Sequence, residues 1–248
     1  MDQNSNLIAD ATLRISRRHA KHYAVLRFLR QHLWSSQQIL QDVMNLQSRQ
    51  AAHKSLMQMR VEGLIQSHLY EALGGNITLW GITAHGQAMA FNPHNEEPYA
   101  TYFEPSRVSE QTIRHQLDLQ KLRVIAEKNG WSEWLDGDRL GFLKIEIKRP
   151  DALVKDHNSM VIAIECERTF KTQKRYQQIL VSYLRLLKSG QISKVVWVLP
   201  SKGMEERLRK IITGINSVSV AGQKIQIDPL KHHVNLHFCA YSDWPHYE

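Results

Sequence analysis

The sequence reads R-P-D-A-L-V at residues 149–154 and V-I-A-I-E-C-E-R-T at residues 161–169, on either side of a turn rich in Asp, His, Asn and Ser. Such residue types favour tight turns, and the second segment is rich in β-branched residues. The pair therefore predicts two strands joined as an antiparallel hairpin. This hairpin would bring Asp151, at the start of its first strand, close to Glu165 and Glu167, at the end of its second.

Three carboxylates at this place predict a bound cation. Side chains two residues apart on a strand share a face, so Glu165 and Glu167 are expected to point together toward Asp151. Carboxylates gathered in this way repel one another unless a positive charge lies among them. A hard divalent cation with oxygen ligands meets that need, so the three residues are predicted to hold Mg²⁺ or Mn²⁺. The alternative is that they are solvated charges at the ends of strands.

The same stretch resembles a known nuclease superfamily. Pro150-Asp151, followed by Glu165-x-Glu167 on the next strand, resembles the PD-(D/E)xK pattern. Where that pattern has a lysine, this chain has Glu167. In the superfamily the lysine can move to the following helix, and Lys171 or Lys174 would then take its place.

The longer run R-P-D-A-L-V … I-E-C-E-R-T-F-K-T-Q-K-R-Y is similar to the replication-relaxation and MobC-type relaxase families of mobile plasmids. This resemblance implies binding at a plasmid transfer origin and metal-dependent nicking of one DNA strand. It also implies two protein partners, an accessory mobilisation protein and a conjugative coupling protein. The catalytic residues would be Asp151, Glu165, Glu167, Lys171 and Lys174, with the three carboxylates holding the metal and one lysine stabilising the developing charge.

The N-terminal part predicts a winged helix-turn-helix domain over residues 1–92. Apolar residues recur at helical spacing in three segments, which begin near residues 17, 37 and 48. Residues 64–70 and 77–82 then predict a β-hairpin. In this order of elements the third helix enters the major groove of DNA. Its predicted polar face carries the candidate DNA-binding residues Arg49, Gln50, His53, Lys54 and Arg60. A helix face used for protein contacts is the alternative.

The remainder predicts a second domain of the α/β (α+β) class. Residues 93–108 include two prolines and read as a linker. Residues 109–248 then give the order α-β-β-β-α-β with additions. This order favours a mixed sheet with flanking helices, like that of the restriction endonucleases that the PD-(D/E)xK resemblance implies.

Composition narrows the possible functions. The chain has 248 residues and a formal net charge of +8, which favours a polyanionic partner such as nucleic acid. Its two cysteines favour reduced thiols in the cytoplasm. No apolar run approaches the ~20 residues of a membrane span, and the polar residues 1–6 do not resemble a signal peptide. The sequence has no Walker loop, no His-Glu-x-x-His and no Gly-x-Ser-x-Gly.

Two other functions remain open at this stage. One is a non-catalytic regulator of plasmid replication or transcription with a degenerate nuclease domain, which the displaced lysine favours. The other is an endonuclease of the restriction or transposon type, which would cut both strands.

Overall fold

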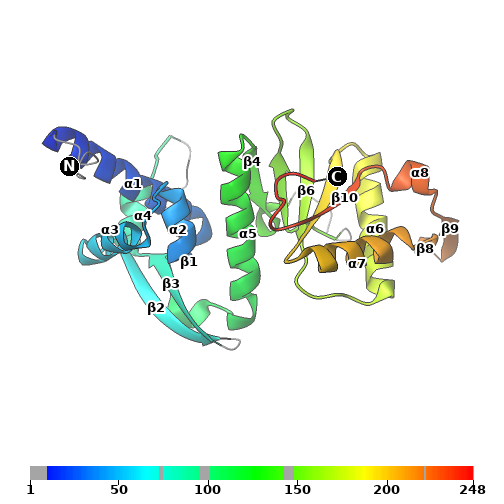
Figure 1. The fold of residues 1–248 in the computed structure, drawn as a ribbon, viewed down its shortest axis with the longest axis horizontal. Coiled ribbons are helices and arrows are strands. Elements are labelled where there is room, and N and C mark those ends of the chain that lie inside the picture. The colour runs from blue at the N-terminus through cyan, green and yellow to red at the C-terminus, as the bar shows by residue number, and fades with distance from the viewer. Residues whose placement is uncertain are drawn as a thin grey trace, which may run out of the picture. The chain divides into compact units, whose positions relative to one another are not determined.

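The computed structural model describes residues 10–72, 75–94, 96, 101–141, 148–220 and 222–247. The chain forms two compact units, and the boundary between them lies between Gln120 and Lys121. Both residues belong to one helix, α5 (Glu110–Lys128), which therefore contributes to both units (Figure 1). This boundary differs from the linker predicted at residues 93–108.

The first unit combines short helices with a small sheet. Its elements are α1 (Ala11–His32), β1 (Trp34–Ser36), α2 (Gln37–Val43), α3 (Arg49–Val61), β2 (Ile65–Ala72), β3 (Gly75–Ile82), α4 (Ala84–Ala90) and the 3₁₀ helix η1 (Pro105–Arg107). The sheet has the order β1-β3-β2 and is antiparallel throughout. Each of the four α-helices begins at an Asp, Ser or Thr whose side chain accepts a backbone N–H, as expected of N-caps.

Residues beyond the predicted linker complete the core of this unit. Phe103 is buried and donates its backbone N–H to the carbonyl of Ile82 at 2.9 Å. Its ring lies so close to Gly81 that a Cβ at that position would be 2.0 Å from the ring. Ile113 of α5 joins the same cluster, and Gln120 donates to the carbonyl of Trp34 at 2.8 Å. The described part of residues 93–108 therefore packs onto this unit.

The second unit is built on a five-stranded mixed sheet in the order β10-β7-β6-β5-β4. The strands are β4 (Ser132–Asp136), β5 (Ala152–Lys155), β6 (Val161–Cys166), β7 (Lys194–Leu199) and β10 (Leu236–Ala240). Strands β4, β5 and β6 pair antiparallel, and β6, β7 and β10 pair parallel. The other elements are η2 (Gly137–Arg139), α6 (Gln173–Lys188), α7 (Lys202–Thr213), the β8 (Ser217–Val220) and β9 (Gln223–Gln226) hairpin, and α8 (Pro229–His232).

The predicted order α-β-β-β-α-β is present as α5-β4-β5-β6-α6-β7. Residues 142–147, which the predicted order includes, lie outside the described residues. Helices α6 and α7 pack on one face of the sheet, where Tyr183 of α6 meets Trp197 of β7 edge to face at 5.6 Å. Burial of each such large side chain stabilises the unit by roughly 1.5–3 kcal/mol.

The predicted hairpin is formed by β5 and β6. Its register pairs Ala152 with Ile164 and Lys155 with Val161. In the turn, the Asp156 carboxylate accepts the backbone N–H groups of Asn158 and Met160, both at 2.9 Å. Because a strand register has a period of two, this pairing fixes which residues face α6 and places the start of β5 beside the end of β6.

Candidate active site

Asp151 and Glu165 come together at the end of the β5–β6 hairpin. The backbone N–H of Asp151 donates to the carbonyl of Ile164 at 3.0 Å. In return, Asp151 Oδ2 accepts the backbone N–H of Cys166 at 2.8 Å. These two bonds hold Asp151 against the end of β6, next to Glu165, as the sequence predicts.

Lys148 places a positive charge between these two carboxylates. Its ammonium donates to Glu165 Oε1 and lies 3.7 Å from Asp151 Oδ1. Its backbone N–H donates to the Ser182 hydroxyl of α6 at 3.3 Å, which anchors this part of the chain on the helix. Lys148 is not among the site residues predicted from the sequence. A lysine three residues before Asp151, in Lys148-Arg149-Pro150-Asp151, is the signal that points to it.

Glu165 is almost fully buried, with 3% of its surface exposed. Burial, and after it the neighbouring Asp151 carboxylate, raise the pKa of Glu165, whereas Lys148 and the Tyr183 hydroxyl lower it, and the net pKa is about 7. Burial lowers the pKa of Lys148, but the carboxylates of Glu165 and Asp151 outweigh this effect and raise it. Lys148 therefore stays charged at pH 7, while Glu165 exchanges its proton near neutrality.

Tyr183 contributes a hydrogen bond from the core. Its hydroxyl donates to Glu165 Oε1, and its ring is completely buried. Burial raises the pKa of Tyr183 well above its ordinary value, and the adjacent Glu165 adds to this increase. The hydroxyl therefore remains protonated and acts as a donor. Tyr176, on the same helix, is also completely buried.

Glu167 lies in a second, neighbouring group. It is 4% exposed and follows β6, where its backbone N–H donates to the carbonyl of Val198 at 3.1 Å. Its carboxylate accepts from the Lys171 ammonium and lies 3.4 Å from the Tyr176 hydroxyl. Lys171 in turn donates its backbone N–H to that hydroxyl at 3.1 Å. Glu167 and Lys171 therefore form an ion pair beside the Asp151–Lys148–Glu165 group.

The two lysines proposed from sequence differ in position. Helix α6 begins at Gln173, because the Thr172 side chain caps it by accepting the N–H of Arg175 at 3.3 Å. Lys171, expected like Lys174 on the helix that follows β6, therefore lies in the connection before that helix. Lys174 lies in the first turn of α6, exposed on the surface.

A divalent cation fits part of the predicted ligand set. The ammonium of Lys148 between Asp151 and Glu165 marks a place that attracts positive charge. Within the described residues, however, no three His, Cys, Asp or Glu side chains form a group that could hold a metal ion. Glu167 is engaged by Lys171 instead. Two carboxylates together with substrate phosphates are a usual ligand set for Mg²⁺, so Asp151 and Glu165 are the protein ligands that fit.

The predicted DNA-binding residues all lie on the exposed side of α3. They are Arg49, Gln50, His53, Lys54 and Arg60. His53 is held at its place, since its Nδ1 lies 3.1 Å from Gln37 Oε1 and its ring packs edge-on against Trp80. The helix is fixed to its unit by the buried residues Ala52, Leu56 and Met59 on its opposite side.

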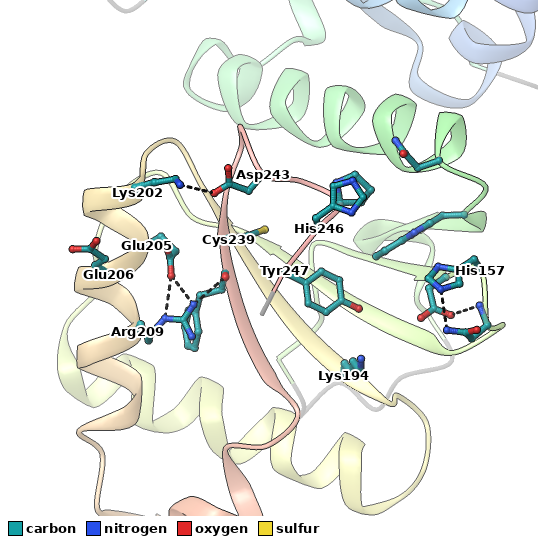
Figure 2. A pocket seen from close by; sticks show the side chains of 16 residues that line it. His157, Lys194, Lys202, Glu205, Glu206, Arg209, Cys239, Asp243, His246 and Tyr247 are labelled. Carbon is teal, nitrogen blue, oxygen red and sulfur yellow. Dashed lines mark hydrogen bonds and ion pairs between the residues drawn. The ribbon is translucent and has the colours of Figure 1, made fainter.

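A separate cavity of about 860 Å³ lies between the end of α5, helix α7, β10 and the C-terminal segment (Figure 2). Its charged side chains are largely paired with one another, as in Lys202 with Asp243 at 3.7 Å and Arg209 with Glu205 at 2.7 Å. None of the predicted catalytic residues lines it. Its paired charges do not indicate a particular ligand.

Comparison of the chain with protein-family models, with curated proteins and with solved structures finds no significant match. No helix in the described part of the chain combines the length and the apolar character that crossing a membrane requires.

Proposed function

We propose that this protein is a metal-dependent DNA endonuclease that binds a plasmid transfer origin and nicks one strand. The observation that carries the proposal is the meeting of Asp151 and Glu165 around the Lys148 ammonium. The elements that position them also support it. Pro150-Asp151 precedes β5, Glu165 lies on β6, and α6 with the parallel strand β7 follows, which is the order of the PD-(D/E)xK core that the sequence resembles.

Lys148 can take the role of the lysine that this chain lacks after Glu165. The superfamily pattern places a lysine two residues after the glutamate, where this chain has Glu167. Lys148, which precedes β5, brings an ammonium to Glu165 instead. We therefore assign to Lys148 the role of stabilising negative charge on the scissile phosphate, with Lys171 as a more distant contributor held by Glu167.

In this proposal the residues of the site either hold the metal ion or position the residues that hold it. Asp151 and Glu165 would hold Mg²⁺ or Mn²⁺, which when bound polarises the phosphate and lowers the pKa of an attacking water. Glu165 must be ionised for this, which its pKa of about 7 allows at neutral and alkaline pH. Tyr183 orients Glu165 from the core through its hydroxyl. The Cys166 N–H fixes Asp151 in the same way.

The first unit supports a role in DNA recognition. Three helices are followed by the β2–β3 hairpin, the order of a winged helix-turn-helix domain. Its third helix presents the exposed residues Arg49, Gln50, Lys54 and Arg60, whose side chains suit contacts with phosphates and base edges. This unit would select the transfer origin, with the accessory mobilisation and coupling proteins as further partners.

Arg49→Ala and Lys54→Ala in the full chain should weaken binding to the origin duplex. Each lost phosphate contact should also reduce the slope of log affinity against log salt by about 1. Fluorescence anisotropy in EDTA at several salt concentrations measures both effects. Arg107→Ala, which removes an exposed arginine of the same unit away from α3, is the matched control. Equal slopes for all variants would make α3 a protein-contact surface.

Nicking of a supercoiled plasmid tests the proposed activity. Plasmids with and without the transfer origin are incubated with the protein in Mn²⁺ or in EDTA. Open-circular product that requires both Mn²⁺ and the origin is the expected result. Linear product would favour a restriction- or transposon-type endonuclease that cuts both strands.

One observation favours a non-catalytic regulator as the second candidate. The Lys148 ammonium already pairs with Glu165 and lies close to Asp151 in the folded chain, and Lys171 pairs with Glu167. A regulator would bind the origin with the same affinity and leave the plasmid supercoiled under every metal condition.

The pKa of Glu165 predicts how activity depends on pH. A carboxyl group with a raised pKa is protonated below that pKa, so cleavage and Mn²⁺ affinity should fall as pH drops through about 7. Because the Tyr183 hydroxyl lowers the pKa of Glu165, Tyr183→Phe should move both midpoints to higher pH. Free Mn²⁺ measured by electron paramagnetic resonance between pH 5.5 and 8.5 gives the affinity independently of cleavage. Midpoints that do not move would remove Tyr183 from the site.

A further inference from the structure

A cavity of about 630 Å³ lies along the outer side of α6, beside the carboxylate site. Four cationic side chains line it: Lys148, Lys174, Arg175 and Arg185. None of the described residues that line it is acidic. We call it the α6 groove. A groove lined by one sign of charge raises the local concentration of ligands of the opposite sign, so its ligand should be an anion.

The α6 groove adjoins the carboxylate site through Lys148. Lys148 lines it and at the same time donates its ammonium to Glu165. Ser182, another lining residue, accepts the Lys148 backbone N–H and holds this junction. A ligand in the groove would therefore lie next to the carboxylates. A small inorganic anion would need only one cation to bind, whereas this groove offers four.

The spacing of the cations fits a polymer of phosphates. Lys174, Gln178, Val181 and Arg185 follow one another at intervals of three or four residues, which places them on one side of the helix. The helix rises about 16 Å between Lys174 and Arg185 at roughly 1.5 Å per residue. One B-DNA strand rises by the same length over about five nucleotides. The half-buried Val181 adds apolar surface between the charges, which sugar rings can contact.

We propose that the α6 groove binds the sugar–phosphate backbone of the DNA strand that enters the carboxylate site. This inference rests on the proposed function for the identity of the polymer, and it adds a second DNA contact to that of α3. Binding here is independent of base sequence, because the lining cations match phosphates and not base edges. Its role would be to hold the strand beside Lys148.

The test uses the full chain with Lys174→Gln, Arg175→Gln and Arg185→Gln, singly and combined. All three residues are exposed, and exposed substitutions of this kind rarely change stability by more than about 0.5 kcal/mol. Lys188→Gln is the matched control, since it removes the same charge from the last turn of the same helix outside the groove. Affinity for the origin duplex and for an unrelated duplex is measured in EDTA over a range of salt.

The triple variant should lose about 3 from the salt slope on both duplexes, since each lost phosphate contact removes about 1. The ratio of the two affinities should stay that of the parent, and Lys188→Gln should behave like the parent. A triple variant with the parent's slope, or a parent that binds neither duplex, overturns the proposal. Because EDTA removes cleavage from the measurement, the two proposals fail separately. If the triple variant changes the slope but the parent never nicks DNA, the groove proposal stands and the nuclease proposal fails. If the parent nicks DNA but the triple variant has an unchanged slope, the nuclease proposal stands and the groove proposal fails.

Discussion

Asp151→Asn and Glu165→Gln should each lower the rate of Mn²⁺-dependent nicking by about 10³-fold, because each removes a carboxylate that would hold a metal ion worth several kcal/mol to the transition state. Asparagine keeps the oxygen that accepts the Cys166 N–H, and glutamine keeps the volume of the buried Glu165 side chain. The fold should therefore survive both changes. Single-turnover nicking at saturating protein measures the chemical step.

Two further measurements separate a lost site from a damaged protein. Affinity for the origin duplex in EDTA should remain close to that of the parent, because α3 belongs to the other unit. Mn²⁺ affinity should fall in both variants. Asp138→Asn, an exposed carboxylate of the same unit, is the control and should nick at the parent's rate. If both site variants also nick at that rate, the carboxylates are not the active site.

The pairing of Asp151 with Glu165 was predictable because strand geometry is local. The turn residues and the apolar strands fix the hairpin, and a period of two then fixes the faces. The same period directs Cys166 away from Glu165, and its buried sulfur lies 2.9 Å from the Tyr241 hydroxyl. Tyr176 and Tyr183 lie two helical turns apart, a spacing that likewise favours burial of both rings.

Other features were not predictable because tertiary contacts decide them. Two prolines suggested a linker, but the packing of Phe103 against Gly81 joins this part of the chain to the first unit. Lys171 and Lys174 were both expected on the helix after β6, and only the folded chain shows that Thr172 caps this helix and that Lys171 lies before it. Lys148 reaches Glu165 because Ser182 of α6 anchors its backbone, 34 positions further along the chain.

The position of Lys148 leads to a sharper prediction about the catalytic cation. From the sequence, Lys171 or Lys174 is predicted to stabilise the negative charge that develops during cleavage. In the structure Lys148 contacts Glu165, Lys171 contacts Glu167, and Lys174 lies exposed in the α6 groove. Lys148→Met should therefore lose roughly 10²–10³-fold in the single-turnover rate, the usual cost of deleting one transition-state donor. Lys171→Met should lose less, and Lys174→Met should cut like the parent at saturating protein.

The main alternative is that Lys148 only stabilises the fold, since its loss leaves Glu165 buried without its cation. Glu165 would then take up a proton more readily, because its pKa is about 7 with Lys148 present and rises once this ammonium no longer lowers it. Thermal denaturation at pH 6 and pH 8 measures the cost, which should be larger at pH 8, where the unpaired carboxylate is charged more often. At pH 6 the variant should fold and still bind DNA in EDTA.

Lys148→Arg completes the set, because it keeps the charge while changing the shape of the donor. If the charge acts on the scissile phosphate, this variant should recover part of the rate that Lys148→Met loses, measured at the same pH and saturating Mn²⁺. A structural role predicts recovery of stability in the arginine variant without recovery of the rate. The opposite result is that Lys148→Met is folded and nicks as fast as the parent while Lys171→Met does not. In that case Lys171 supplies the catalytic cation, and Lys148 only neutralises Glu165.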